Sequence, residues 1–338
     1  MDLNAVWFVL IGILFTGYAV LDGFDLGVGA LHLLARRDKD RRVLLNAIGP
    51  VWDGNEVWLV TGGGALFAAF PEAYATVFSG FYIAFFLFLA ALVFRAVSIE
   101  FRSKLPWRWW RATWDVGFCL GSLIGGLLLG VALGNIVWGI PLNAEGVYTG
   151  RFIDLLHPYA LLAGVTSVAL FMMHGAIYLH LKTEGALQEQ IRSWIRPCII
   201  FFVLTYSLLS LATLLYVPRA TSALRGQPWL FAVVVLTVLA IANIPREIFG
   251  DRPGRAFLSS CATIVLLMAL FGLNMYPVLV PSEPNVAHSL DIYRAASSQQ
   301  TLGIMLIIAG IGMPLVLAYT ASIYWIFRGK VRLTETSY

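Results

Sequence analysis

The chain has 338 residues, of which 59% are hydrophobic and only 12% are charged, whereas ordinary soluble domains carry roughly a quarter charged residues. This composition excludes a soluble globular fold, because one core of this size could not hold so many apolar side chains. The net charge of +4 does not indicate a nucleic-acid partner, because the basic residues form short clusters between apolar stretches.

Nine apolar stretches are long enough, or nearly so, to cross a hydrocarbon layer of roughly 30 Å as helices. In chain order they are Val6 to Leu34, Val51 to Phe70, Thr76 to Phe94, Trp114 to Trp138, Pro158 to Leu181, Pro197 to Val217, Trp229 to Ile244, Ala256 to Val280 and Thr301 to Phe327. The seventh is short and is expected to end at Pro245. We therefore predict an all-α integral membrane protein of about nine transmembrane helices, with residues 1–338 in a single polytopic membrane domain.

The basic residues are distributed unevenly between alternate loops. Nineteen of the 23 lysines and arginines fall in loops one, three, five and seven and in the C-terminal tail. The other four are Arg151, Arg219, Arg225 and Arg294. Cytoplasmic loops carry the excess of basic residues, so the N-terminus is predicted to be periplasmic and the C-terminus cytoplasmic. The first four residues include an aspartate and no basic residue, so a cleaved signal peptide is not expected.

Internal repetition is faint. The tripeptide Ala-Leu-Phe at 65–67, before Pro71, is echoed at 269–271, before Pro277. Two four-helix halves with one peripheral helix would give such an echo, and so would chance between two apolar segments. Both interpretations stay open from the sequence.

Two carboxylates lie near the cytoplasmic end of the first predicted helix. About 20 residues from Val6 cross a 30 Å layer, which places Asp22 and Asp25 in its cytoplasmic part. They share a helix face, and the glycines around them allow a neighbouring helix to approach closely. Carboxylates in hydrocarbon are costly, so this pair indicates a function such as proton transfer, with pairing to an arginine as the main alternative.

Two more carboxylates, Asp53 and Glu56, lie at the start of the second predicted helix. That helix enters from the same side, so Asp53 could meet Asp22 and Asp25. A set of carboxylates at this edge of the bundle could accept protons and pass them inward. Capping of the helix N-terminus explains Asp53 and Glu56 equally well from their spacing.

Asp115 and several tryptophans are expected near the membrane interfaces. Asp115 begins the fourth predicted helix beside the aromatic and basic run at 107–111, so an N-terminal carboxylate next to an aromatic belt is the favoured interpretation. Trp52 and Trp58 are interpreted as interfacial anchors. Trp52, Trp58 and Asp115, together with Glu56, are also candidates for supporting roles on a proton path.

The histidines and cysteines do not form a recognisable metal or haem site. A membrane cytochrome needs histidines paired at matched depth, and only His174 lies clearly within a predicted span. A hydrogen bond to a neighbouring helix is the expected role of His174. The cysteines are Cys119, Cys198 and Cys261, and they are expected to be small buried residues without metal-ligand spacing.

Longer motifs carry a resemblance to a known family. The first helix contains DGFDLGVG at 22–29, and the second segment reads WDGNEVWLVTGGGALFAAFP at 52–71. Further matches are FRAVSIEFRSK at 94–104, GVALGNIVWGIP at 130–141, MYPVLVPS at 275–282 and YTASIYW at 319–325. Across essentially its whole length the chain resembles subunit II of bacterial cytochrome bd-type quinol oxidases.

That resemblance implies a role in aerobic respiration. It implies a heterodimer with a subunit I that carries haems b and d, the oxygen-reducing site and the site for ubiquinol or menaquinol, with no cofactor confidently bound by this chain. Cytoplasmic protons would be consumed in reducing oxygen to water. In the family, an aspartate of the WDGN motif helps line the proton path; here that is Asp53, and Asp25 belongs to the same neighbourhood. Small accessory membrane subunits are further candidate partners, alongside membrane lipid and quinone.

Two alternatives are carried with this hypothesis. A proton-coupled secondary transporter would also use carboxylates in the membrane. A purely structural subunit would have no proton role. Because the outer loop from Pro218 to Pro228 is short, the sequence does not decide whether this chain has a lipid or quinone cavity.

Overall fold

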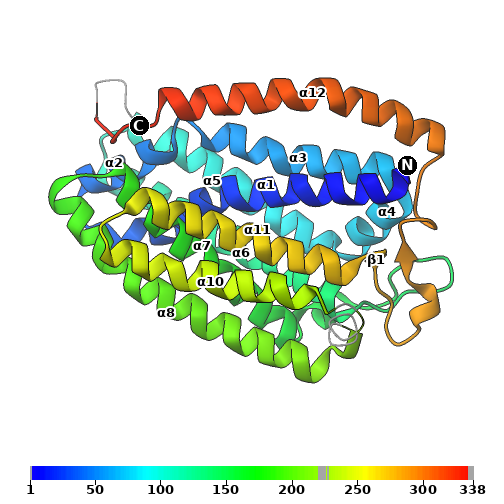
Figure 1. The fold of residues 1–338 in the computed structure, drawn as a ribbon. Coiled ribbons are helices and arrows are strands. Elements are labelled where there is room, and N and C mark those ends of the chain that lie inside the picture. The colour runs from blue at the N-terminus through cyan, green and yellow to red at the C-terminus, as the bar shows by residue number, and fades with distance from the viewer. Residues whose placement is uncertain (1, 220–225, 227, 334–338) are drawn as a thin grey trace.

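The protein is a bundle of long helices that run nearly side by side (Figure 1). The computed structural model describes residues 2–219, 226 and 228–333. Within these residues, eight helices are long and apolar enough to cross a membrane, which confirms the all-α membrane fold. They are α1 (Leu3–Leu31, continued by the 3₁₀ turn η1, His32–Leu34), α5 (Tyr82–Phe101), α6 (Arg108–Trp138), α7 (Pro158–Lys182), α8 (Gly185–Tyr216), α10 (Leu230–Phe249), α11 (Pro253–Met275) and α12 (Gln299–Ile326).

The second predicted span is also helical. It forms α3 (Trp52–Ala69), which packs along α1 and is not among the eight because polar residues in its first turns lower its mean hydropathy. The short helix α4 (Pro71–Gly80) follows and ends at Phe81, where α5 begins a new direction. The predicted third span, Thr76 to Phe94, is therefore wrong at both ends. Helix α5 continues past Phe94 to Phe101, because Arg95 is paired inside the protein and does not have to leave the membrane.

Three other helices extend beyond their predicted boundaries. Helix α8 begins at Gly185 instead of Pro197, because its polar first turns bury a stripe that includes Ile191 and Ile195. Helix α10 continues through Pro245 to Phe249, since membrane helices tolerate a proline where packing compensates for the lost hydrogen bond. Helix α6 begins at Arg108, two turns before Trp114.

The connections contain further short elements. Helix α2 (Asp38–Ile48) lies within the first basic loop and buries Leu44, Leu45 and Ile48. Helix α11 ends at Met275, before the predicted Val280, because β1 (Val278–Val280) pairs antiparallel with β2 (Leu290–Asp291). The remaining 3₁₀ turns are η2 (Arg102–Lys104), η3 (Phe152–Leu156) and η4 (Val286–His288).

Helix α1 occupies the centre of the bundle and packs against α3, α6, α7 and α11. Its closest neighbour is α7, at the crossing of Gly27 and Gly175. A side chain on Gly27 would overlap the carbonyl oxygen of Phe171. The expectation that glycines near Asp22 and Asp25 admit a neighbouring helix is confirmed.

Helix α12 lies at the periphery. Leu302 is its one buried residue, and the helix packs against α1 and α3 (Figure 1). It starts beside the start of α1, where Trp7 Nε1 donates to the carbonyl oxygen of Leu302 at 3.0 Å, and it ends at the opposite end of the bundle. Which end faces the cytoplasm, and whether two halves are duplicated, stay predictions. Arg225 and most of the Pro218 to Pro228 loop lie outside the described residues.

Candidate functional site

A buried ion pair joins α5 to α1. Arg95 Nη2 lies 2.5 Å from Asp22 Oδ1, and Arg95 Nη1 lies 3.1 Å from Asp22 Oδ2. Neither side chain has any exposed surface. Pairing with an arginine, the main alternative for this carboxylate, is thus found at Asp22. Two parallel N–H···O bonds fix both the position and the orientation of the guanidinium.

The same guanidinium reaches two more carboxylates. Arg95 Nη1 donates to Glu56 Oε1 at 2.8 Å, and Asp25 Oδ2 lies 3.9 Å from Arg95 Nη2. Asp25 is fully buried, while the Glu56 side chain keeps 21% of its surface exposed. We call Asp22, Asp25, Glu56 and Arg95 the buried carboxylate cluster. It contains three acidic groups and one basic group.

Asn55 and Tyr324 extend this cluster toward α12. Asn55 Nδ2 donates to Asp25 Oδ2 at 2.7 Å and lies 3.1 Å from the carbonyl oxygen of Leu21. Asn55 Oδ1 accepts from the Tyr324 hydroxyl at 2.9 Å. Asp25 Oδ1 is buried and has no hydrogen-bond partner among the described residues.

Asp53 does not join the buried carboxylate cluster. Its side chain is exposed on the face of α3 that points away from α1. The residues Val57, Val60, Gly64 and Phe67 are also exposed and follow Asp53 at intervals of three or four, so they form one stripe along the helix. Glu56, one turn further along α3 and partly buried, makes the contact that the sequence suggested for Asp53.

The two candidate tryptophans lie inside the bundle to different degrees. Trp58 is 8% exposed and packs with Leu14 and Tyr18, so its interpretation as an interfacial anchor is wrong. The small residue Gly17 on α1 leaves the space that the Trp58 ring fills. Trp52 is partly buried beside Ile48.

Asp115 binds several cationic groups at the end of the bundle. It accepts from Arg102 Nε at 2.5 Å and from Arg41 Nη1 at 2.7 Å, and it lies 2.6 Å from His32 Nε2. Arg102 also donates to Asp38 at 2.8 Å. The interpretation of Asp115 as a carboxylate at a helix N-terminus is wrong, because α6 begins two turns earlier. Asp115 instead ties α6 to η1, α2 and η2.

Sequence reasoning missed three residues of this site: Arg95, Asn55 and Tyr324. Arg95 was counted among the basic loop residues, although a charged residue directly after nineteen apolar or small residues was a signal that the helix continues. Asn55 was part of the WDGN motif but was not considered as a ligand of Asp25. Tyr324 belongs to the YTASIYW motif, but its contact with Asn55 depends on how α12 docks, which the sequence does not show.

Comparison with known proteins identifies the family. Residues 3–327 match the family of cytochrome bd terminal oxidase subunit II. The chain belongs to this family. It is 37% identical to cytochrome bd-I ubiquinol oxidase subunit 2 of Escherichia coli strain K12, over 97% of this chain and 95% of that protein. It is 35% identical to cytochrome bd ubiquinol oxidase subunit 2 of Bacillus subtilis strain 168, over 99% and 98% of the two chains.

The fold agrees with a solved bd oxidase. A chain in the structure of bd oxidase from Geobacillus thermodenitrificans superposes with a TM-score of 0.79 at 19% identity, covering 97% of this chain and 98% of that chain. The resemblance stated from the motifs is confirmed. The chain is therefore subunit II of a bd-type quinol:oxygen oxidoreductase in the cytoplasmic membrane, and the transporter alternative is excluded.

Haem belongs to a cytochrome bd complex, so the histidines of this subunit II were compared with a haem ligand set. His174 Nδ1 lies 2.7 Å from Ser260 Oγ, and His174 Nε2 lies 3.0 Å from the carbonyl oxygen of Val20. The expected hydrogen bonds to neighbouring helices are confirmed, and both ring nitrogens are engaged. Within the described residues, no three His, Cys, Asp or Glu side chains gather as a metal site. With both ring nitrogens engaged, His174 is not placed as an axial ligand of a haem.

Proposed function

We propose that this subunit II takes up protons from the cytoplasm through Asp53 and the buried carboxylate cluster, and delivers them to a subunit I that carries haems b and d and the quinol site. The observation that carries the proposal is that three carboxylates share one guanidinium at the end of α1 and α3. The subunit also stabilises its haem-bearing partner.

The charge balance of the cluster supports an exchangeable proton. If Asp22, Asp25 and Glu56 were all ionised beside Arg95, two negative charges would stay uncompensated in a buried region. Uncompensated buried charge is costly, so a state with bound protons is favoured. Asp22 is held by two bonds to Arg95, whereas Asp25 Oδ1 has no hydrogen-bond partner in the part of the chain that the structure describes. We place the exchangeable proton at Asp25.

Each neighbour of Asp25 has a separate task in this scheme. Arg95 holds Asp22 through two hydrogen bonds, so that this carboxylate is fixed beside Asp25. Asn55 holds Asp25 Oδ2 and leaves the other oxygen available. Glu56 is the partly exposed member of the cluster, and in this scheme it passes a proton from the water-accessible edge to the buried carboxylates. Proton transfer along such a chain requires carboxyl groups within reach of each other or of one water molecule.

The exposed position of Asp53 supports a role at a subunit boundary. It is continuous with the apolar stripe of Val57, Val60, Gly64 and Phe67. No atom of the described residues lies within 4 Å of the place where Gly64 would carry a side chain. Such a stripe admits another helix at close range. We propose that subunit I packs there, so that Asp53 lies between the two subunits.

Variants of the complete complex test the proton role. With an affinity tag on this chain, the complex is purified and its haem absorption and quinol-dependent oxygen consumption are measured. Asp53→Asn and Asp25→Asn are expected to lower turnover at least about tenfold while haem content stays unchanged. The matched control is Glu72→Gln in the first turn of α4, an exposed carboxylate outside the cluster. Normal turnover in both aspartate variants would support a purely structural subunit.

A further inference from the structure

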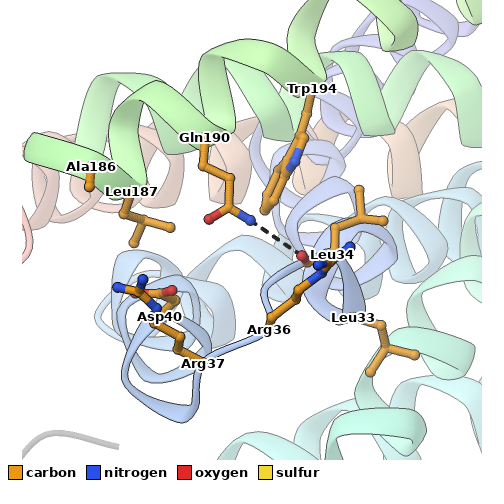
Figure 2. Close-up of a pocket in the computed structure, with 9 residues that line it drawn as sticks. All are labelled: Leu33, Leu34, Arg36, Arg37, Asp40, Ala186, Leu187, Gln190 and Trp194. Carbon is orange, nitrogen blue, oxygen red and sulfur yellow. Dashed lines mark hydrogen bonds between the residues drawn. The ribbon is translucent and has the colours of Figure 1, made fainter.

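A cavity of about 760 Å³ lies at the end of the bundle where η1 leads into α2. Its other wall is formed by the first turns of α8, and Figure 2 shows Gln190 and Trp194 of α8 facing Leu34 and Arg36 across it. The lining residues are Leu33, Leu34, Arg36, Arg37, Asp40, Ala186, Leu187, Gln190 and Trp194. None of them belongs to the buried carboxylate cluster.

The cavity lies at the depth of lipid headgroups. The first membrane-spanning segment ends at Leu34, which forms part of one wall. Helix α8 has 32 residues and is therefore about 48 Å long, well beyond a hydrocarbon layer of roughly 30 Å. Its polar first turns extend past the hydrocarbon, and Trp194 lies where they meet the apolar part, as interfacial tryptophans do. By the distribution of basic residues this is the cytoplasmic side.

The charge of the cavity favours a singly charged anion. The side chains of Arg36 and Arg37 are exposed, and no ion pair engages either of them among the described residues. Asp40 offsets one of the two, which leaves a net charge of +1. In addition, α2 and α8 both begin at this cavity without a side-chain cap, so their first N–H groups are not satisfied by side chains.

The walls are apolar as well as basic. Leu33 and Leu34 are 38% and 49% exposed, so the cavity presents apolar as well as charged surface. With Leu187 and Trp194 they form a surface that an inorganic ion or a sugar phosphate would leave uncovered. A ligand that joins a phosphate to hydrocarbon covers both parts of the cavity.

We propose that this cavity binds an anionic phospholipid of the inner leaflet. The phosphodiester lies against Arg36 and Arg37, and the glycerol and upper acyl chains lie along Leu33 and Trp194. The site is distinct from the proton-transfer residues, and it places a lipid between α1, α2 and α8.

Lipid retention by the purified complex tests this proposal. The complex is prepared in mixed micelles that contain either phosphatidylglycerol or phosphatidylcholine, and native mass spectrometry measures the lipid that remains bound. The double variant Arg36→Gln, Arg37→Gln is expected to weaken phosphatidylglycerol binding at least about tenfold. The control is Lys39→Gln with Arg196→Gln, which removes the same charge from exposed neighbours that do not line the cavity.

A second variant distinguishes lipid binding in this cavity from general attraction of the lipid to a basic surface. Ala186→Trp fills the mouth of the cavity without changing any charge and is expected to lower phosphatidylglycerol retention as well. Equal losses in the cavity variant and the control, or equal retention of the two lipids by the wild type, would overturn the proposal. Displacement of phosphatidylglycerol by millimolar inorganic phosphate would identify a free-phosphate site instead. Oxygen consumption plays no part in the readout, so the outcome is independent of the proton role.

Discussion

Arg95 on α5 and Asp22 on α1 form a two-bond ion pair, 2.5 Å and 3.1 Å long, in which neither side chain is exposed. The residues are 73 positions apart in the chain. Their pairing holds α5 against α1 and brings the same guanidinium to Glu56 and near Asp25. Arg95 thus compensates part of the charge of three carboxylates at once.

Arg95→Gln is expected to destabilise the complex strongly. The substitution leaves three acidic groups around a neutral side chain, and the loss of one partner of a buried pair costs about 3–5 kcal/mol. The thermal midpoint of the purified complex and its yield from membranes both measure this loss. The double variant Arg95→Gln, Asp22→Asn removes both members of the pair and is expected to recover part of the stability. If Arg95→Gln matched the wild type, the cluster would not depend on this cation.

Substitutions at Asn55 and Tyr324 compare how much two linked hydrogen bonds contribute to stability. One joins Asn55 to Asp25 and the other joins Tyr324 to Asn55. Asn55→Leu removes the donor to the buried Asp25 and is expected to cost about 1–3 kcal/mol. Tyr324→Phe removes the bond to the other end of the same amide and is expected to cost about 1 kcal/mol or less. Thermal unfolding of the two variants gives the comparison. A larger loss in Tyr324→Phe would mean that α12 docking, and not Asp25, is the main function of Asn55.

The sequence was sufficient to locate Asp22 and Asp25, because carboxylates within an apolar stretch are conspicuous whatever the fold. It was not sufficient to find their partner. Arg95 follows Phe94, and hydropathy alone cannot tell a basic residue that ends a span from one that is neutralised by another helix. That distinction depends on how α5 is placed relative to α1, which involves residues far apart in the chain.

The same limit explains the errors at Asp115 and Trp58. Hydropathy marks where lipid-facing apolar residues begin, whereas α6 starts two turns earlier at Arg108, so Asp115 was placed in the wrong turn. Trp58 was interpreted from its distance to the membrane interface, but its ring fills the space above Gly17 inside the bundle. The existence of the long membrane helices followed from composition, whereas their boundaries and the short helices α2 and α4 depended on tertiary contacts.

Asp2→Asn is expected to have a pH-dependent effect on stability. The Tyr293 hydroxyl donates to Asp2 at 2.9 Å, and this bond lowers the pKa of Asp2 below 3.8 and raises the pKa of Tyr293 to about 12. A lowered folded-state pKa means that the carboxylate stabilises the fold fully above pH 3.8 and loses that effect as the pH falls through the folded value. Asparagine keeps one acceptor oxygen for the N–H groups of Asn4 and Ala5, and its NH2 group replaces the oxygen that accepts from Tyr293, so the variant removes the charge together with that acceptor.

The measurement is the difference in thermal midpoint between wild type and Asp2→Asn across an acid titration. We expect the wild type to be more stable above pH 3.8 and the two midpoints to converge below it. Tyr293→Phe should abolish most of the pH dependence of this difference, because it removes the main cause of the shift. A difference that stays constant with pH would show that the charge of Asp2 contributes nothing.

Gly27→Ala is expected to disrupt the crossing of α1 and α7. In an isolated helix, alanine is favoured over glycine by about 1 kcal/mol, so propensity alone predicts a gain in stability. At this crossing, however, the added carbon would overlap the carbonyl oxygen of Phe171 and approach Gly175 N at 2.9 Å. Backbone atoms cannot move aside as a flexible side chain does, so the helices must separate at a cost of about 1–3 kcal/mol or more. Gly12→Ala on the same helix is the control, because among the described residues no atom lies within 4 Å of its added carbon. A lower thermal midpoint for Gly27→Ala, beside an unchanged or higher one for Gly12→Ala, is the expected pattern, since the close approach of α1 and α7 is what carries Asp22 and Asp25 into the interior.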